Sequence, residues 1–195
     1  ILNLNQNNLQ MLNPDAFSEL PKLHTLNLVF NQIRILQEGV FRFLSANPVV
    51  HLKCNQISRV EDAFKGSLAR DIVLDLRANR IENLAEGVFN NHGFEDVNLN
   101  NNPLKTIATK FCGENCSMKN FHCICCYLNK DGLQTIRDLA LIKKTFLYVG
   151  GCYDATYGDS ILEIQYVCGG SKNNRAGKLL LVLVLLRSFN DFLLA

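Results

Sequence analysis

The chain has 195 residues, enough for one domain of ordinary size or one short repeat array, and 48% of them are hydrophobic, which is ample for a core. Its formal net charge is only +2, and no run of Lys and Arg exceeds two residues. This charge pattern excludes the basic footprint of a nucleic-acid-binding protein and a polybasic membrane-binding patch.

An asparagine recurs at nearly constant spacing through the first half of the chain. Aliphatic residues stand five and three positions before each copy and two positions after it, as Leu26, Leu28 and Ile33 do around Asn31. The five copies, separated by steps of 24, 24, 24 and 23 residues, are Asn7, Asn31, Asn55, Asn79 and Asn102. A period of this length predicts a solenoid with one coil per repeat.

Each repeat contains the parts that such a coil needs. The alternation around the first two aliphatic positions predicts a short strand with one buried face. The asparagine amides are expected to satisfy backbone groups inside the solenoid as a ladder. One phenylalanine per repeat is expected to form an apolar spine on the convex side, and these residues are Phe17, Phe41, Phe64, Phe89 and Phe111. Repeat three is one residue shorter between Val60 and Phe64.

The pattern L-x-L-x-x-N-x-L-x-x-L over residues 1–111 resembles the extracellular leucine-rich repeat family in its typical form of about 24 residues. The resemblance implies an α/β solenoid, a right-handed coil with a concave parallel β-sheet and a disulfide-stapled C-terminal cap. We therefore expect five repeats in 1–111, the first truncated, a cysteine-rich cap in 112–170, and a polar spacer with an apolar tail in 171–195. Because the chain begins inside a repeat, we interpret it as a fragment or a processed form.

Seven of the eight cysteines lie in the last half of the chain, which indicates disulfides and an oxidising compartment. Residues 120–126, followed by a helix expected over 132–141, resemble the C-terminal flanking cap of extracellular leucine-rich repeat proteins. By this resemblance Cys123 pairs with Cys152, and Cys125 pairs with Cys168. Cys126 is extra to the pattern and is an alternative to Cys125.

Other interpretations of this region stay open. A zinc site is the alternative to disulfides, and its ligands would come from Cys112, Cys116, His122, Cys123, Cys125 and Cys126. Cys54, in repeat three, is expected to be a small half-buried residue beside the ladder, with a free thiol or an intermolecular disulfide as the alternative. Asn115 begins the only N-x-S/T sequon and is a candidate for glycosylation in a secreted protein.

The tail combines small residues at 169–171, a polar spacer at 172–178 and eight apolar residues at 179–186. This combination resembles a glycolipid-anchor signal. The alternatives are a terminal apolar segment packed on the cap and a membrane span, although a span needs about 20 mainly apolar residues. Membrane association is expected only through this tail.

Residues between the buried leucines point outward from the concave sheet, where they form ladders at common phase. The most mixed central positions are expected to bind a protein ligand, and they are His51, Lys53, Val73, Asp75, Arg77 and Asn98.

No phosphate-binding glycine loop, nucleophile elbow or HExxH motif occurs in the sequence, and no nucleophile accompanies the ladder neighbours His51 and Asp75. We expect no catalytic residue, no metal and no cofactor. The predicted function is a non-catalytic extracellular protein-binding module of receptor, adhesion or recognition type, secreted or anchored at the cell surface. The alternative is a non-catalytic carrier subunit of a secreted enzyme. Nucleic acid is not an expected partner.

Overall fold

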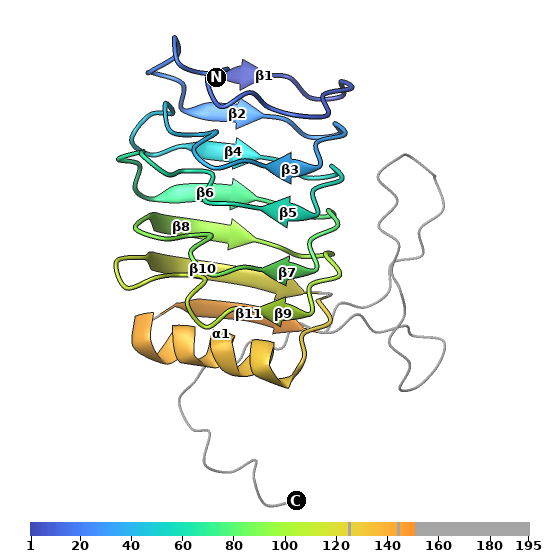
Figure 1. Ribbon diagram of the computed structural model, residues 1–195, viewed down its shortest axis with the longest axis vertical. Helices are drawn as coiled ribbons and strands as arrows, with labels where there is room; N and C mark the ends of the chain where they lie inside the picture. Colours follow the sequence, from blue (N-terminus) through green and yellow to red (C-terminus); the bar gives the residue numbers. More distant parts are fainter. Residues whose placement is uncertain (125, 144, 151–195) are drawn as a thin grey trace, which may run out of the picture.

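The computed structural model describes residues 1–124, 126–143 and 145–150. They form a solenoid whose successive coils stack along one axis (Figure 1). Each coil contributes one strand, and β11 adds a last one after helix α1, to a seven-stranded parallel sheet of order β1-β2-β4-β6-β8-β10-β11. The strands are β1 (Leu2–Asn3), β2 (Thr25–Asn27), β4 (Val49–His51), β6 (Ile72–Asp75), β8 (Gly93–Asn98), β10 (Ser117–Ile124) and β11 (Phe146–Gly150). The predicted solenoid with a parallel sheet is therefore confirmed.

Two short sheets form on the opposite side of the coils (Figure 1). One pairs β3 (Ile35–Leu36) with β5 (Arg59–Val60), and the other pairs β7 (Asn83–Leu84) with β9 (Thr106–Ile107). We number the coils by their ladder residue, so that coil 1 carries Asn7 and coil 5 carries Asn102.

The long sheet is in register by whole repeats, since Leu26 pairs with Val50, Val50 with Leu74 and Leu74 with Val97. These four side chains are almost completely buried. Their alternation with outward-facing residues is the period of two that a sheet with one buried face requires.

The asparagine ladder forms as predicted, and each inner rung bonds three backbone groups in its own coil and the preceding coil. Asn55 donates from Nδ2 to the carbonyl oxygens of Leu28 at 2.9 Å and Leu52 at 3.0 Å, and its Oδ1 accepts from the Ile33 amide at 3.0 Å. Asn31, Asn79 and Asn102 repeat these bonds with the equivalent partners. The side chain thereby satisfies buried backbone groups where the chain turns out of the strand.

The residue before each ladder asparagine adopts a left-handed backbone conformation. The five residues, with φ between 52° and 60°, are Gln6, Phe30, Cys54, Ala78 and Asn101. Asn tolerates this conformation well, but only one of the five is Asn. The bonds of the following asparagine hold this turn in a conformation that the side chains disfavour.

The phenylalanine spine also forms, with one detour. Phe17 packs on Phe41, and Phe41 packs on Phe64 with ring centroids 5.2 Å apart. Between coils 3 and 4 the spine passes through Phe94, which contacts Phe64 at 5.9 Å and Phe89 at 4.9 Å. Phe89 then leads to Phe111 and on to Phe121. A residue from the start of β8 thus bridges the convex sides of two coils.

The sheet continues past residue 111 as a sixth coil that the leucine pattern does not reveal. Phe121 and Cys123 take the two buried strand positions, and Cys126 stands 24 residues after Asn102, at the ladder phase. The Sγ of Cys126 lies 3.8 Å from the Leu99 carbonyl oxygen, next to the coil below, as the ladder amides do.

The expected helix is confirmed as α1 (Lys130–Lys143), slightly longer than residues 132–141. Asn129 caps it, since its Oδ1 accepts a hydrogen bond from the Gly132 amide at 2.8 Å. Ile136 and Leu139 are buried, and the Thr135 hydroxyl donates to the Ile107 carbonyl of coil 5. The helix therefore packs on the end of the array, beside β9 (Figure 1).

Two disulfides join Cys112 to Cys116 and Cys123 to Cys126. The expected pairing of Cys123 with Cys152 is therefore wrong. The turn at the ladder position brings the Cα atoms of Cys123 and Cys126 to 5.5 Å, which is within disulfide reach. Disulfides also hold four of the five cysteines that the zinc alternative would use, namely Cys112, Cys116, Cys123 and Cys126.

Cys54 is 6% exposed, more buried than expected, and is disulfide-bonded, so the free-thiol alternative is wrong. The expected pairing of Cys125 with Cys168, and the tail at 171–195, lie outside the described residues. Among the helices that the structure describes, none has the length and apolar character to cross a membrane.

Candidate binding surface

The sheet brings the six predicted ligand-binding residues together on its outward face. Its register places His51 beside Asp75 and Asp75 beside Asn98, each from a neighbouring strand. Val73 lies one ladder away, beside Asp96. Lys53 and Arg77 follow the ends of β4 and β6 by two residues and lie half-buried. We call this group the central patch.

The ladder that contains Asp75 and Asn98 also shapes the backbone of the coils, which the sequence did not show. Asn3, Asn27, Asp75 and Asn98 each accept a hydrogen bond at Oδ1 from the backbone amide two residues later, at 3.1–3.2 Å. A short side chain with an oxygen at this phase therefore shapes the turn that ends each strand. Within the central patch, Asp75 and Asn98 serve the coil itself.

Asp75 and Arg77 form a bidentate ion pair at the centre of the patch. The Arg77 guanidinium donates from Nε to Asp75 Oδ1 at 2.8 Å and from Nη2 to Oδ2 at 2.6 Å. The Asp75 side chain is 10% exposed and that of Arg77 is 41% exposed. The largely buried carboxylate therefore fixes the orientation of the partly exposed guanidinium.

The structure adds an aromatic end to the concave surface, which sequence reasoning missed. His122 and Tyr148 continue the ladder of Asn98 through β10 and β11. Their rings stack at a centroid distance of 4.3 Å and an angle of 4°, and His122 Nε2 lies 2.9 Å from Asp96 Oδ2. Phe146 on β11 is 63% exposed. We call Asp96, His122, Phe146 and Tyr148 the aromatic end.

A sequence signal for the aromatic end existed. His122 stands 24 residues after Asn98, which is one repeat. The residues around it depart from the leucine pattern, so the sequence alone groups His122 with the cysteine-rich segment. Exposed aromatic side chains next to charged groups are frequent among the residues that dominate protein–protein affinity.

An exposed ion-pair network borders the concave face at the start of the strands. The Lys119 ammonium bonds Glu95 on the neighbouring strand and lies 3.3 Å from Asp71. These hydrogen bonds, first to Glu95 and then to Asp71, raise the pKa of Lys119. Because the groups are exposed to water, the network adds little to stability and mainly sets the charge of this edge.

Comparison with known proteins supports the repeat assignment. Residues 1–47 match the family model for the leucine rich repeat. The strand register of this segment continues through coil 5. The solenoid is therefore consistent with leucine-rich repeats well beyond the matched residues. No curated protein and no solved structure gives a significant match.

Proposed function

We propose that this chain is a non-catalytic, extracellular protein-binding module that uses its concave surface. Leucine-rich repeat domains generally mediate protein–protein interactions, and the match over residues 1–47 brings this expectation to the chain. The proposal goes further, since it places the contact on the central patch and the aromatic end together.

The supporting observation is the continuity of that surface. Seven parallel strands in register present Lys53, the fixed guanidinium of Arg77, and the stacked pair of His122 and Tyr148 on one face. A rigid sheet that holds cationic and aromatic side chains in place lowers the entropy cost of binding a protein. Since Asp75 and Asn98 are engaged by their own backbone, the contact residues of this proposal are Lys53, Arg77, His122, Phe146 and Tyr148.

The two disulfides support the extracellular setting, because such bonds persist in oxidising compartments. Asn115 is exposed on the turn before β10, which fits glycosylation at this sequon. Cys116, the middle residue of the sequon, is bonded to Cys112. A mobility shift of the secreted chain on treatment with an N-glycosidase tests this assignment.

Affinity capture with three forms of the full chain tests the binding surface. The forms are wild type, a concave variant with Lys53→Glu and Tyr148→Ala, and a matched variant with Lys22→Glu and Tyr127→Ala. Lys22 is exposed outside the sheet, and Tyr127 follows the end of β10 with 41% of its surface exposed. Quantitative mass spectrometry of proteins captured from conditioned medium is the measurement.

The proposal expects a protein that wild type and the matched variant retain and that the concave variant loses by at least about tenfold. Arg77 is left unchanged because its removal would leave the buried Asp75 carboxylate without its cation. Equal retention by all three forms, each with an unchanged circular dichroism spectrum, would place the contact on another surface.

A further inference from the structure

The convex wall of the solenoid is interrupted between coils 3 and 4. β3 pairs with β5, and β7 pairs with β9, but in the described chain β5 and β7 belong to separate sheets. Figure 1 shows β5 and β7 farther apart than the strands within either pair. On the concave side the same two coils stay joined, through β4 and β6.

Backbone hydrogen bonds at one repeat phase locate this interruption. The Glu61 amide of coil 3 donates to the Leu36 carbonyl of coil 2, and the Ala108 amide of coil 5 donates to Leu84 of coil 4, both at 2.9 Å. The equivalent Ala85 amide forms no such bond to Val60, although the structure describes all of residues 58–89. We call the facing, unpaired edges of β5 and β7 the seam.

Loop length explains why the seam opens here. In coils 2 and 4 the phenylalanine comes five residues after the buried residue of the short convex strand. The loop between them contains a glycine with positive φ, Gly39 at 68° and Gly87 at 74°. In coils 3 and 5 the phenylalanine comes four residues after that buried residue, and the loop contains no glycine. A long loop donates to the short loop that follows it, as Gly39 does to Asp62 and Gly87 to Lys110. Between coils 3 and 4 the order is reversed, because the short loop of coil 3 precedes the long loop of coil 4. The loop-to-loop hydrogen bond is absent there.

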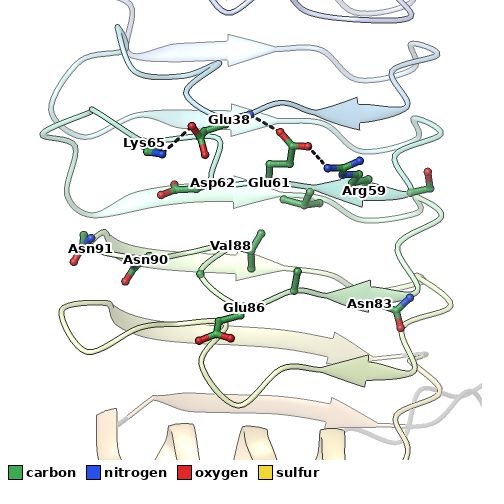
Figure 2. A pocket seen from close by; sticks show the side chains of 14 residues that line it. Glu38, Arg59, Glu61, Asp62, Lys65, Asn83, Glu86, Val88, Asn90 and Asn91 are labelled. Carbon is green, nitrogen blue, oxygen red and sulfur yellow. Dashed lines mark hydrogen bonds and ion pairs between the residues drawn. The ribbon is translucent and has the colours of Figure 1, made fainter.

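A groove of about 680 Å³ occupies the seam, within the usual range of ligand sites. Figure 2 shows Glu61 and Asp62 on the coil 3 wall and Val88 and Asn90 on the coil 4 wall. The lining includes four carboxylates against two cations, so its charge is negative. These six residues are Glu38, Arg59, Glu61, Asp62, Lys65 and Glu86.

The charges in the groove are unevenly compensated. Arg59 pairs with Glu61 at 2.7 Å, and Lys65 pairs with Glu38 at 2.9 Å, a hydrogen bond that raises the pKa of Lys65. Glu86 forms no ion pair with any described residue. The carboxylates without an ion pair to Lys or Arg are therefore Asp62, on coil 3, and Glu86, on coil 4, whose carboxylate is directed away from Asp62 (Figure 2).

His92 fixes Asp62 from inside the solenoid. Its ring is 4% exposed, lies 6.0 Å from the Phe64 ring, and places Nε2 3.0 Å from Asp62 Oδ1. The other ring nitrogen, Nδ1, is buried without a partner in the described structure. The histidine thus contributes one bond, directed to the groove carboxylate.

We propose that the seam groove binds an extended, basic segment of a partner protein. The backbone of that segment pairs with the unpaired edges of β5 and β7, as in strand addition to an open sheet. Separate Lys or Arg side chains of the segment pair with Asp62 and with Glu86, the two lining carboxylates that have no ion pair to Lys or Arg. This site lies on the convex side and is independent of the concave surface proposed above.

Fluorescence anisotropy with three labelled octapeptides tests the proposal on the full chain. The first alternates Lys and Thr, the second has Glu in place of Lys, and the third is the Lys peptide with N-methylated Thr amides. The Lys peptide is expected to bind at least about tenfold more tightly than either other peptide, because one lacks the charge and the other lacks backbone donors.

Matched variants locate the binding. Glu86→Lys is expected to weaken the Lys peptide by about tenfold, whereas Glu19→Lys, the same change at an exposed acid in coil 1, is expected to change it less than twofold. Bound peptide should also slow hydrogen exchange of the Ala85 amide. The proposal fails if Glu19→Lys and Glu86→Lys weaken binding equally, if the N-methylated peptide binds as well, or if Lys53→Glu on the concave face abolishes binding.

Discussion

In coils 2–5, one amide side chain per coil satisfies three backbone groups of the solenoid. The cost of losing it depends on where the rung lies. Asn55 is 7% exposed, between two complete coils, and its bonds reach Leu28, Ile33 and Leu52. Asn7 is exposed in coil 1 and bonds only the carbonyls of Leu4 and Asn5.

Asn55→Ala is expected to lower the free energy of unfolding by about 2–4 kcal/mol, because the buried Ile33 amide and two carbonyls lose their partner. Asn7→Ala is expected to cost under about 1 kcal/mol, since water replaces the lost bonds. Urea unfolding followed by circular dichroism measures both values. Equal costs would mean that the ladder bonds do not determine the stability of the buried turn.

The residue rows that define the fold were predictable because each recurs at constant spacing and each has one physical task. Leu26, Asn55 and Phe41 are examples, and all three lie where the period places them. The side-chain-to-backbone bond of Asp75 was not predictable in this way. It depends on the backbone direction at the end of the strand, which the spacing of apolar residues does not report, so the sequence alone predicts ligand contacts for Asp75 and Asn98.

At the scale of elements, the solenoid consists of coil pairs rather than equal coils. Coils 2 and 3 share β3 and β5, and coils 4 and 5 share β7 and β9. At the same position in three successive coils the amide is therefore bonded in coil 3, unbonded to the preceding coil in coil 4, and bonded in coil 5, which provides an internal comparison within one molecule.

Native-state hydrogen exchange is expected to separate these positions. The Ala85 amide at the seam should exchange at least about tenfold faster than the Glu61 and Ala108 amides, which donate to Leu36 and Leu84. Mass spectrometry with fragmentation at single-residue resolution measures all three in one sample. Comparable protection of Ala85 would show that β5 and β7 pair in solution and that the seam is closed.

The sequence contained the cause of the seam but not its consequence. Repeat three is visibly shorter before Phe64, yet whether a short loop matches its neighbour depends on which partner donates and where glycine permits a positive φ. The cysteines show a similar limit. Cys126 lies one repeat after Asn102, but its bond to Cys123 follows from the turn geometry, whereas the pairing implied by the family pattern led to Cys152.

At the scale of the whole molecule, a repeat array unfolds cooperatively only as far as its coil interfaces couple neighbours. We expect the coupling to be weakest at the seam, where β5 and β7 share no backbone bonds and Phe94 is the ring that bridges Phe64 and Phe89. Phe111 has a similar bridging role between Phe89 and Phe121, among the coils that follow the seam. Both rings are almost completely buried.

Phe94→Ala and Phe111→Ala are each expected to cost about 3–5 kcal/mol, the usual loss for a buried aromatic ring, but with different unfolding profiles. All five tyrosines lie in residues 127–166, so tyrosine fluorescence reports only the part beyond the seam, whereas circular dichroism reports the whole chain. In Phe94→Ala the dichroism midpoint in urea should fall below the fluorescence midpoint, because coils 1–3 lose their coupling and unfold first. In Phe111→Ala the two midpoints should stay together, since the seam contacts of Phe94 remain. Coincident midpoints in Phe94→Ala would show that the concave sheet alone couples coils 1–3 to the coils beyond the seam.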